Sequence, residues 1–432
     1  MDQHSNSIHM LEMTKIRAER DEIITALKKR NIDVTETIDA IIAKDQQWRA
    51  AKTSMESIAS ELNKIAKEIG EFFKSGKTSE AEAAKAKTAD LKQEEHQLKL
   101  EVDTLENEIT QLLYQIPNVP NALVVAGKNE EDNETIEVVG EPSVLHNNAL
   151  PHWELTKKFD LIDFELGVKI TGAGFPVYRG KGAKLQRALI QFFLEEAEKA
   201  GYEEFIVPHV VNEASAYGTG QLPDKEGQMY HMPVDDLYMI PTAEVPLTNI
   251  YRDVLLPDEN FSIKMTGYTP CFRREAGSYG AHVRGLNRLH QFDKVEIVRI
   301  EHPKNSERAL TEMVNHVKGL LEKLGLHYRI LRLCGGDTGF ASAMTYDFEV
   351  YSAAQEKWLE VSSCSRFDTF QANRLKLRFK GSDKKNYLAH TLNGSALALP
   401  RIMASIMENY QTLDGIEIPE VLHKYTGFTR ID

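Results

Sequence analysis

Residues 48–72 read WRAAKTSMESIASELNKIAKEIGEF, and the apolar side chains in this stretch recur at alternating intervals of three and four residues. A repeat of this kind puts every apolar position on one stripe of a helix, where it packs against the stripe of a partner helix. The stretch therefore predicts one limb of a coiled coil. The positions concerned are Trp48, Ala51, Met55, Ile58, Leu62, Ile65, Ile69 and Phe72.

A second apolar stripe follows in the chain, so the first limb has a partner close by in sequence. Gly76, between the two stripes, suits a tight turn, and Ser79 with Glu82 has the spacing of a capping box for a new helix. Two helices joined by a short turn, each with one apolar stripe, predict an antiparallel pair. The second stripe consists of Leu91, Leu98, Val102, Leu105, Ile109, Leu112 and Ile116.

Pro117 and Pro120 end the second helical stretch, so residues 1–116 and 117–432 are expected to be separate domains. In the second domain short strand-like runs are interspersed with helical stretches without regular strand–helix–strand units. No phosphate-binding P-loop and no strand-linked G-x-G-x-x-G occurs, so we expect an α+β fold with a largely antiparallel sheet. The strand-like runs include 205–207 and 237–240, and the helical stretches are 182–200, 304–324 and 398–412.

Composition narrows the class of protein. The apolar stretches are far shorter than the roughly 18 residues of a membrane span, and the N-terminal residues lack the pattern of a secretory signal. The only cysteines, Cys271, Cys334 and Cys364, include no C-x-x-C pair, which fits a reducing compartment and indicates a cytoplasmic protein. The net charge of -13 repels polyanions, so any nucleic acid must be bound by local basic surface.

The segment 271–278, CFRREAGS, has the residue types of a phosphate site. Arg273 is permanently charged and can bind phosphate oxygens with two N–H groups. Glu275 would share its face if the segment ends a strand, which would put a cation and an acceptor in one pocket. Read alone, the segment is more often a surface ion pair at a hairpin.

The segment that follows ends in an alternating strand pattern. Phe292, Lys294 and Glu296 fall on one face of that strand, and a face with two charges is not an ordinary core face. Phe292 could stack on a base, and Glu296 could hold an ammonium group. A solvent-facing strand with a cross-strand ion pair is an equally good interpretation of this segment alone.

Three further segments carry candidate groups. Thr242 and Glu244 follow a strand-like run, and Glu360 followed by Ser362 and Ser363 offers oxygen ligands for Mg²⁺ beside a nucleotide. Residues 391–401 read as strand, turn and helix, and an arginine on the first helical turn could reach a phosphate. Read singly, these segments are more often a strand exit, a strand end and an ordinary strand–helix junction.

Together these segments resemble the signature motifs of class II aminoacyl-tRNA synthetases, and specifically the seryl-tRNA synthetase family of bacterial type. Residues 182–208 resemble motif 1, 271–296 motif 2 and 391–411 motif 3. The segments 218–223, 242–244 and 360–363 resemble loops specific to the seryl family, and the arm resembles its antiparallel coiled coil. The likeness spans nearly the whole chain, with its elements in family order.

The resemblance implies a tRNA-binding domain over 1–116, with a long coiled-coil arm, and a class II catalytic domain over 117–432. It implies a homodimer through motif 1 and a ligase that activates L-serine with ATP and Mg²⁺. The seryl group then passes to the terminal ribose of tRNA(Ser), with tRNA(Sec) as a further acceptor. Arg274 stands where the family often has Ser, and Ala396 and Pro400 where it often has Gly. Proline is a good first-turn residue, so we do not expect the helix to move.

The same resemblance implies a role for each site residue. Arg273 and Arg401 would hold the α- and γ-phosphates of ATP and, with Glu275, are expected to be the catalytic residues. Around serine we expect Thr242, Ala243, Glu244, Glu296 and Ser395. Around ATP we expect Arg273, Arg274, Glu275, Phe292, Glu360, Val361, Ser362, Ser363 and Arg401, with Glu360 and Ser363 as ligands of Mg²⁺.

The arm explains how an acidic protein can meet RNA. Between Glu61 and Lys92 there are seven lysines and six acidic residues, so this stretch is locally slightly basic and can contact phosphates. Two other functions stay open at this stage. A ligase that charges a carrier protein would be expected to lack the arm, and a non-catalytic adaptor would be expected to lose Arg273, Glu275 or Arg401.

Overall fold

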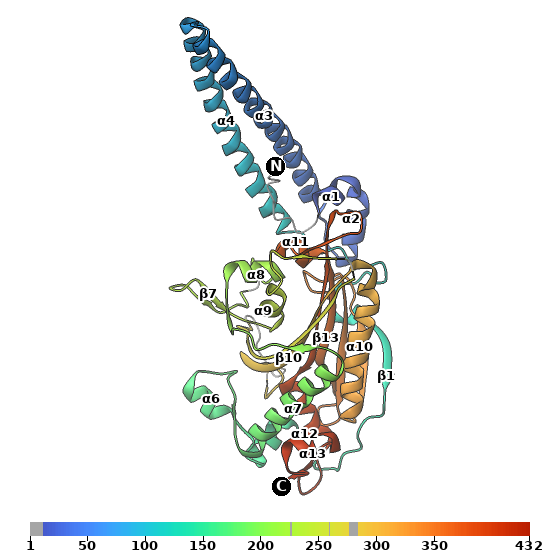
Figure 1. Ribbon diagram of the computed structural model, residues 1–432. Coiled ribbons are helices and arrows are strands. Elements are labelled where there is room, and N and C mark those ends of the chain that lie inside the picture. The colour runs from blue at the N-terminus through green and yellow to red at the C-terminus, as the bar shows by residue number, and fades with distance from the viewer. Residues whose placement is uncertain (1–11, 225–226, 259, 276–283) are drawn as a thin grey trace. The chain divides into compact units, whose positions relative to one another are not determined.

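The computed structural model describes residues 12–224, 227–258, 260–275 and 284–432, and it divides into two compact units (Figure 1). The first unit runs up to Thr25 and from Asp33 to Pro117, and the second comprises Ala26–Ile32 and Asn118–Asp432. No helix in the described ranges is long and apolar enough to cross a membrane.

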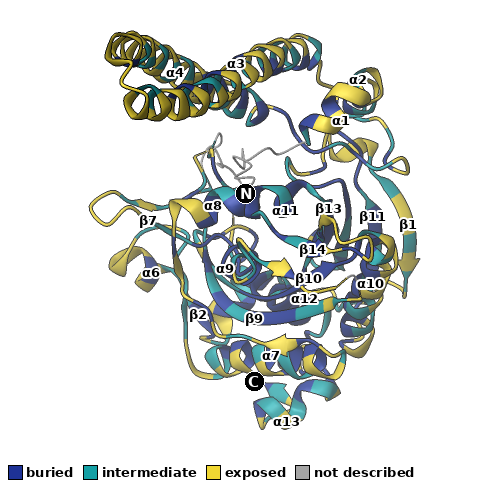
Figure 2. Cartoon of the chain, turned by 45° about the horizontal axis from the view of Figure 1, so that its top comes forward, coloured by how far each residue is buried: buried dark blue, intermediate teal, exposed yellow. Residues whose placement is uncertain are grey.

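The first unit is built on the two long helices that the heptads predict. Helix α3 (Thr35–Lys74) and helix α4 (Thr78–Leu113) pack along their length, and Gly76 turns the chain with a φ of 72°. The seam is buried at Ala51, Ile58 and Ile65 of α3, while exposed residues cover the outer faces (Figure 2). The coiled-coil arm is therefore confirmed. Two short helices, α1 (Met13–Ala18) and α2 (Arg20–Leu27), precede it.

Two details of the arm differ from prediction. The predicted capping box at Ser79 is wrong, because α4 begins one residue earlier, at Thr78, and its N-cap Lys77 makes no side-chain capping bond. Leu113 rather than Leu112 is fully buried at the end of the seam. Leu113 follows the buried Ile109 by four residues and so continues the same face, and α4 ends there, four residues before Pro117.

Residues 26–32 were expected to belong with the arm, but they pack with the second unit. Arg30 is buried and donates to the carbonyl oxygens of Asn118 (2.9 Å), Thr338 (2.8 Å) and Ser342. Burial lowers the pKa of this arginine to about 10. A side chain that donates hydrogen bonds to several buried carbonyl oxygens holds its own segment beside them. Residues 26–32 therefore belong to the second unit, although the arm follows them in the sequence.

The second unit is an α+β domain around an eight-stranded sheet. Every neighbouring pair in this sheet is antiparallel except β4 with β9, which confirms the predicted fold class. In spatial order the strands are β1 (Glu134–Val139), β11 (Tyr328–Arg332), β12 (Met344–Ser352), β13 (Lys357–Asp368), β16 (His390–Ala398), β10 (Gln291–Glu301), β9 (Ser262–Phe272) and β4 (Glu203–Glu204).

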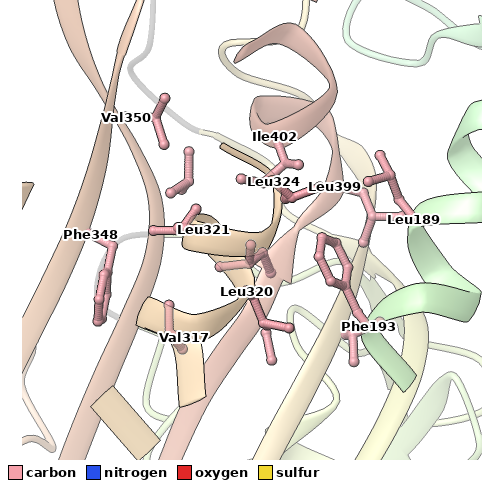
Figure 3. Close-up of a cluster of buried hydrophobic side chains, with 14 of the residues drawn as sticks. Leu189, Phe193, Val317, Leu320, Leu321, Leu324, Phe348, Val350, Leu399 and Ile402 are labelled. Atoms are coloured by element: carbon pink, nitrogen blue, oxygen red, sulfur yellow. The ribbon is translucent and has the colours of Figure 1, made fainter. Parts of the chain in front are cut away.

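Three predicted helices cover one face of the sheet and form the main core (Figure 3). They are α7 (Gly180–Lys199), α10 (Ser306–Lys323) and α12 (Leu399–Asn409). Phe193, Leu320, Leu321 and Ile402 are fully buried or nearly so between them, and each such side chain stabilises the fold by roughly 1.5–3 kcal/mol relative to an exposed one.

The opposite face of the sheet carries a smaller apolar cluster and the shorter elements. Ile297 of β10 faces the main core, and the next residue, Val298, faces the smaller cluster with Leu247 and Leu375. The elements on this side are α8 (Glu213–Thr219), α9 (Glu244–Asn249) and α11 (Phe370–Leu375).

Small sheets and short helices complete the unit. The small sheets are formed by β2 (Ile162–Asp163) with β3 (Val177–Tyr178), by β5 (Val210–Asn212), β7 (Leu237–Met239) and β6 (His231–Met232), by β15 (Asn386–Leu388), β14 (Arg378–Lys380) and β8 (Leu255–Leu256), and by β17 (Ile416–Glu417) with β18 (Arg430–Ile431). The remaining helices are α5 (His152–Lys158), α6 (Phe164–Ile170) and α13 (His423–Thr426).

The predicted strand at 205–207 is wrong, although its neighbour 237–240 is confirmed as β7. The pairing with β9 ends once the Phe205 N–H has bonded to the Thr266 carbonyl, and Ile206 then turns outward with 92% of its surface exposed. Pro208 lacks an N–H and restricts the residue before it, so the ladder cannot continue.

Candidate active site

A carboxylate lies at the centre of the second unit, where β10 passes between β9 and β16. Glu296 of β10 is fully buried and accepts a hydrogen bond from Thr242 Oγ1 at 2.7 Å. Lys294 Nζ lies 2.5 Å from the same carboxylate, and Asn393 Nδ2 of β16 donates to it at 3.3 Å. A buried carboxylate held by a cation and two donors is compensated for the water it has lost.

A second carboxylate, Glu244, is also buried, but within the described part of the chain no cation is hydrogen-bonded to it. It is the first residue of α9, and it accepts from Gln371 Nε2 at 2.6 Å. Gln371 is held by Thr391 Oγ1 (2.6 Å) and by the Thr219 carbonyl (3.1 Å). Burial raises the pKa of Glu244 to about 7, and the nearby charge of Glu296 adds to this. The group therefore favours an incoming cation.

The other residues expected around serine lie on the same strands or beside them. Ser395 of β16 is directly opposite Glu296 in the β10–β16 register and is 8% exposed. Ala243 is fully buried, and its methyl group packs in the smaller apolar cluster. Only its backbone is therefore left to meet a ligand.

Arg273 and Phe292 form a cation and an aromatic plate beside these carboxylates. The Arg273 guanidinium lies 5.2 Å from the centre of the Phe292 ring, and its Nε donates to the Pro241 carbonyl at 3.4 Å. The Arg273 N–H donates to the His290 carbonyl, which fixes the backbone just past the end of β9. The charge of Arg273 reaches Glu244, where it opposes the rise in pKa.

Arg274 and Glu275 do not continue the strand that the sequence suggested. Strand β9 ends at Phe272, and Glu275 has a φ of 48°, so it does not share a strand face with Arg273. The Glu275 carboxylate accepts from Arg288 Nε, while Arg274 is exposed with its guanidinium 6.0 Å from the Tyr230 ring. The predicted Ala-Gly-Ser turn at 276–278 lies outside the described residues.

Arg401 occupies the first turn of α12, as the sequence predicted, with Pro400 beside it. Its Nη1 donates to the Glu360 carbonyl at 2.7 Å and lies 3.3 Å from the Glu360 carboxylate. Its Nε donates to the Asn287 carbonyl at 3.2 Å. Neither Pro400 nor Ala396 displaces the helix, because α12 begins at Leu399 with proline within its first turn.

Residues 360–363 lie within β13 rather than at a strand end. The Ser362 hydroxyl donates to the Ser395 carbonyl at 2.5 Å, and Val361 is buried in the main core. Four adjacent strands thus bring the predicted residues to neighbouring positions. In order across the sheet they are Arg273 after β9, Phe292 and Glu296 on β10, Ser395 on β16, and Glu360 and Ser363 on β13.

Asp347 is a site residue that the sequence reasoning missed. It lies opposite Ser363 in the β12–β13 register, and its Oδ1 is buried without a hydrogen-bond partner among the described residues. Burial and the charge of Glu360 raise its pKa well above the ordinary value, while Arg401 opposes the rise. Such oxygen donors suit a hard cation. The described ranges contain no cluster of three or more His, Cys, Asp or Glu side chains that could hold a metal ion.

Lys294, Gln371 and Asn393 also have parts in the site that no sequence motif assigned to them. The alternating pattern put Lys294 on the same strand face as Glu296, so the sequence did indicate that these two side chains could form an ion pair. Gln371 and Asn393 come from α11 and β16, and only the register of the sheet brings them to the carboxylates.

Comparisons with known proteins agree with this architecture. The family model of the seryl-tRNA synthetase N-terminal domain matches residues 10–120, and that of the class II tRNA synthetase core domain (G, H, P, S and T) matches residues 230–410. The serine–tRNA ligase of Salinibacter ruber is 47% identical over 98% of this chain and 99% of its own length. That of Akkermansia muciniphila is 44% identical over 97% and 98%.

Solved structures show the same likeness. The seryl-tRNA synthetase of Pyrococcus horikoshii, solved in complex with ATP, is 32% identical with a TM-score of 0.90, covering 98% of this chain and 99% of that chain. The cytoplasmic serine–tRNA ligase of Naegleria fowleri, in complex with AMP, is 26% identical with a TM-score of 0.85.

Replacing Glu244 by Gln should stabilise the protein at pH 8. The pKa of Glu244 rises from 4.5 to about 7 on folding, so the folded state binds its proton more tightly, and stability is lost as the pH rises between these values. The penalty is complete above pH 7 and amounts to at most about 3 kcal/mol. Thermal unfolding between pH 5 and 8 measures it.

The difference between Glu244→Gln and the wild type should shrink toward zero as the pH approaches 4.5. Glu420→Gln, at an exposed glutamate, is the matched control and should show no such trend. A stability difference that is the same at pH 5 and pH 8 would contradict the raised pKa.

Proposed function

The chain belongs to the serine–tRNA ligase family, and we propose that its adenylation site is the cluster carried by β9, β10, β16 and β13. The protein is an ATP-dependent ligase that joins serine to tRNA. The observation that supports this location is the pair of buried carboxylates, Glu244 and Glu296, beside the guanidinium of Arg273.

Serine is bound where these carboxylates meet Thr242 and Ser395. Serine is a zwitterion with one hydroxyl, so its site must offer acceptors for an ammonium and a hydroxyl and a cation for its carboxylate. Glu244 and Glu296 provide the acceptors, and Arg273 lies close enough to lower the pKa of Glu244. Alanine and glycine would leave these buried acceptors unpaired, which can discriminate by about 10⁴ or more. Threonine must be refused by volume.

ATP lies between the two arginines in this proposal. Phe292 stacks on adenine, Arg273 holds the α-phosphate, and Arg401 holds the γ-phosphate. Glu275 lines the adenine or ribose side, Arg274 adds a contact to ATP, and the backbone of 360–363 runs along the nucleotide. The serine carboxylate attacks the α-phosphorus and is already ionised, so no general base is needed. The arginines neutralise charge and fix the line of attack.

Glu360 and Ser363 are the proposed protein ligands of Mg²⁺, and Asp347 joins them. The orphaned Oδ1 of Asp347, opposite Ser363, is the observation that fits a hard cation at this place. When bound, Mg²⁺ would neutralise triphosphate charge. Arg401 lies between the Glu360 carboxylate and the Asn287 carbonyl, beside this proposed cation site.

The protein acts as a homodimer through the outer face of α7 and the segment after β4. Ile190 and Leu194 of α7 are half-buried and line a surface cavity together with Tyr268, and Ile206 nearby is 92% exposed. An exposed isoleucine beside half-buried apolar side chains is typical of a surface that a second copy covers.

The arm binds the tRNA, and we expect tRNA(Ser) and tRNA(Sec) as acceptors, with transfer to the terminal 3′-hydroxyl. Lys64, Lys67, Lys74 and Lys77 are exposed on the half of the arm nearest its turn. Contacts from lysine to phosphate read the shape of the RNA rather than its sequence, which allows both tRNAs. Three free, buried cysteines fit a cytoplasmic enzyme.

Glu296→Ala and Glu360→Gln should impair opposite halves of the first step. The first change removes a buried acceptor for serine, so serine-dependent ATP–pyrophosphate exchange should fall by at least about 100-fold while ATP still binds. The second change, Glu360→Gln, should weaken the binding of MgATP and leave the KM for serine unchanged. Each variant is the control for the other, and an unchanged exchange rate in Glu296→Ala would refute the serine site.

Removing residues 50–112, with a short flexible link in their place, should leave serine adenylation largely intact and abolish tRNA charging. A gentler version reverses the charge of the exposed lysines 64, 67 and 74, and should weaken charging more at low than at high salt, because salt already weakens the lysine–phosphate contacts of the wild type. Transcripts of tRNA(Ser) and tRNA(Sec) are assayed side by side. Full charging without the arm would show that its role is only structural.

Ile206→Asp should convert the dimer to a monomer, because it places a charge at the centre of the proposed apolar interface. Analytical ultracentrifugation measures the change. Val234→Asp is the control, since Val234 is 97% exposed on the turn between β6 and β7. If the wild type is monomeric at micromolar concentration, the dimer proposal fails.

A further inference from the structure

Helix α5 contacts the chain immediately after the undescribed stretch 276–283, through three consecutive residues. His152 is fully buried, and its Nε2 accepts from the Leu286 N–H at 2.8 Å. Trp153 lies beneath the Arg284 guanidinium, 5.0 Å from the ring centre, and Glu154 pairs with the same arginine at 3.3 Å. Residues 284–286 are thereby held from one side along their whole length.

The hydrogen bonds assign a single protonation state to the His152 ring. Its Nδ1 lies 2.7 Å from Glu408 Oε1. A backbone N–H only donates, so Nε2 accepts from Leu286 and carries no proton, which leaves Nδ1 as the donor to Glu408. His152 is therefore neutral, with its proton on Nδ1, and joins Glu408 to Leu286.

The chain approaches the imidazole too closely for a side chain at position 285. Gly285 has a φ of 67°, and a Cβ there would come within 2.3 Å of His152 Nε2. Both the conformation and the close approach require glycine. The contact between His152 and 285–286 is thus fixed by the backbone on one side and by Glu408 on the other.

The same segment is tied to α12 a second time. The Asn287 carbonyl accepts from Arg401 Nε at 3.2 Å, and Glu408 lies two turns further along the same helix. Arg401 has two backbone acceptors, Asn287 and Glu360. One of them comes from the segment that His152 holds.

We propose that His152 is a positioning residue for adenylation, which fixes residues 285–287 so that the Asn287 carbonyl orients the Arg401 guanidinium toward the nucleotide. This inference rests on the proposed function, in which Arg401 binds the triphosphate. His152 does not touch the substrate. The segment that it holds contacts Arg401, which binds the triphosphate in the proposed function, so the effect of His152 is expected on ATP and not on serine.

His152→Asn and His152→Gln separate this role from a contribution to stability. An Asn amide reaches the place of Nδ1, so it keeps the bond to Glu408 but offers no acceptor to Leu286. A Gln amide reaches the place of Nε2, so it keeps the acceptor and gives up Glu408. Each variant loses one buried hydrogen bond, and their thermal midpoints should be similar.

The Kd for ATP should rise about fivefold or more in His152→Asn, the equivalent of one hydrogen bond, and should stay within about twofold of wild type in His152→Gln. Titration calorimetry with ATP measures it directly. In ATP–pyrophosphate exchange the KM for ATP should follow the Kd, while the KM for serine stays constant in both variants. Equal ATP affinity in the two variants, or a parallel rise of both KM values, would overturn the proposal.

Gly285→Ala tests the same contact without altering the buried histidine. It should push the chain off His152 Nε2 and raise the Kd for ATP as His152→Asn does, so the proposal stays testable if the Asn variant fails to fold. The Trp153 emission should shift in both, because Arg284 moves from its ring. Wild-type protein without serine-dependent exchange would refute the proposed function instead, and the ATP affinities would still decide the role of His152.

Discussion

Two carboxylates buried in the second unit determine which charged and polar side chains must lie around them. Burying an ionised carboxylate costs several kcal/mol unless cations and donors compensate it. Lys294, Thr242 and Asn393 compensate Glu296, whereas the Glu244 carboxylate has Gln371 as its one hydrogen-bond donor among the described residues, and burial raises its pKa to about 7. A fold selected for stability alone would put apolar side chains at both positions. Glu244 has fewer compensating partners than Glu296, which is understandable if a cationic ligand completes the site. The free energy lost by burying Glu244 is then recovered when the ligand binds.

Helix α12 links the apolar core to the polar site. Its apolar side contributes Ile402, Met403 and Ile406 to the main core, and this fixes the rotation of the helix against the sheet. With that rotation set, Arg401 on the first turn reaches Glu360 of β13, and Glu408 two turns later meets His152. Because a packed core resists rotation of its helices, the polar groups are held with the accuracy of the core.

The sequence predicted the arm well because a heptad repeat is a local pattern that needs no knowledge of the rest of the chain. It also predicted α7, α10 and α12, which are long and strongly amphipathic. It failed at 205–207, where three apolar residues suggested a strand but Ile206 is exposed. Apolar character alone does not distinguish a buried strand from an exposed segment of the chain. The strand geometry expected for Arg273 and Glu275 failed because β9 ends at Phe272.

The candidate site was predicted unevenly for a related reason. Arg273, Phe292, Glu296 and Arg401 stand in recognisable segments, and the sheet brings those segments onto adjacent strands. Asp347 and His152 belong to no such segment. Asp347 reaches the site because the register of β12 and β13 puts it opposite Ser363. His152 reaches it because α5 packs against residues 285–286. Register and helix packing are set by contacts between residues far apart in the chain. Residues that stand in recognisable segments can therefore be found from local chemistry, whereas residues such as Asp347 and His152, which register or helix packing brings to the site, need the structure.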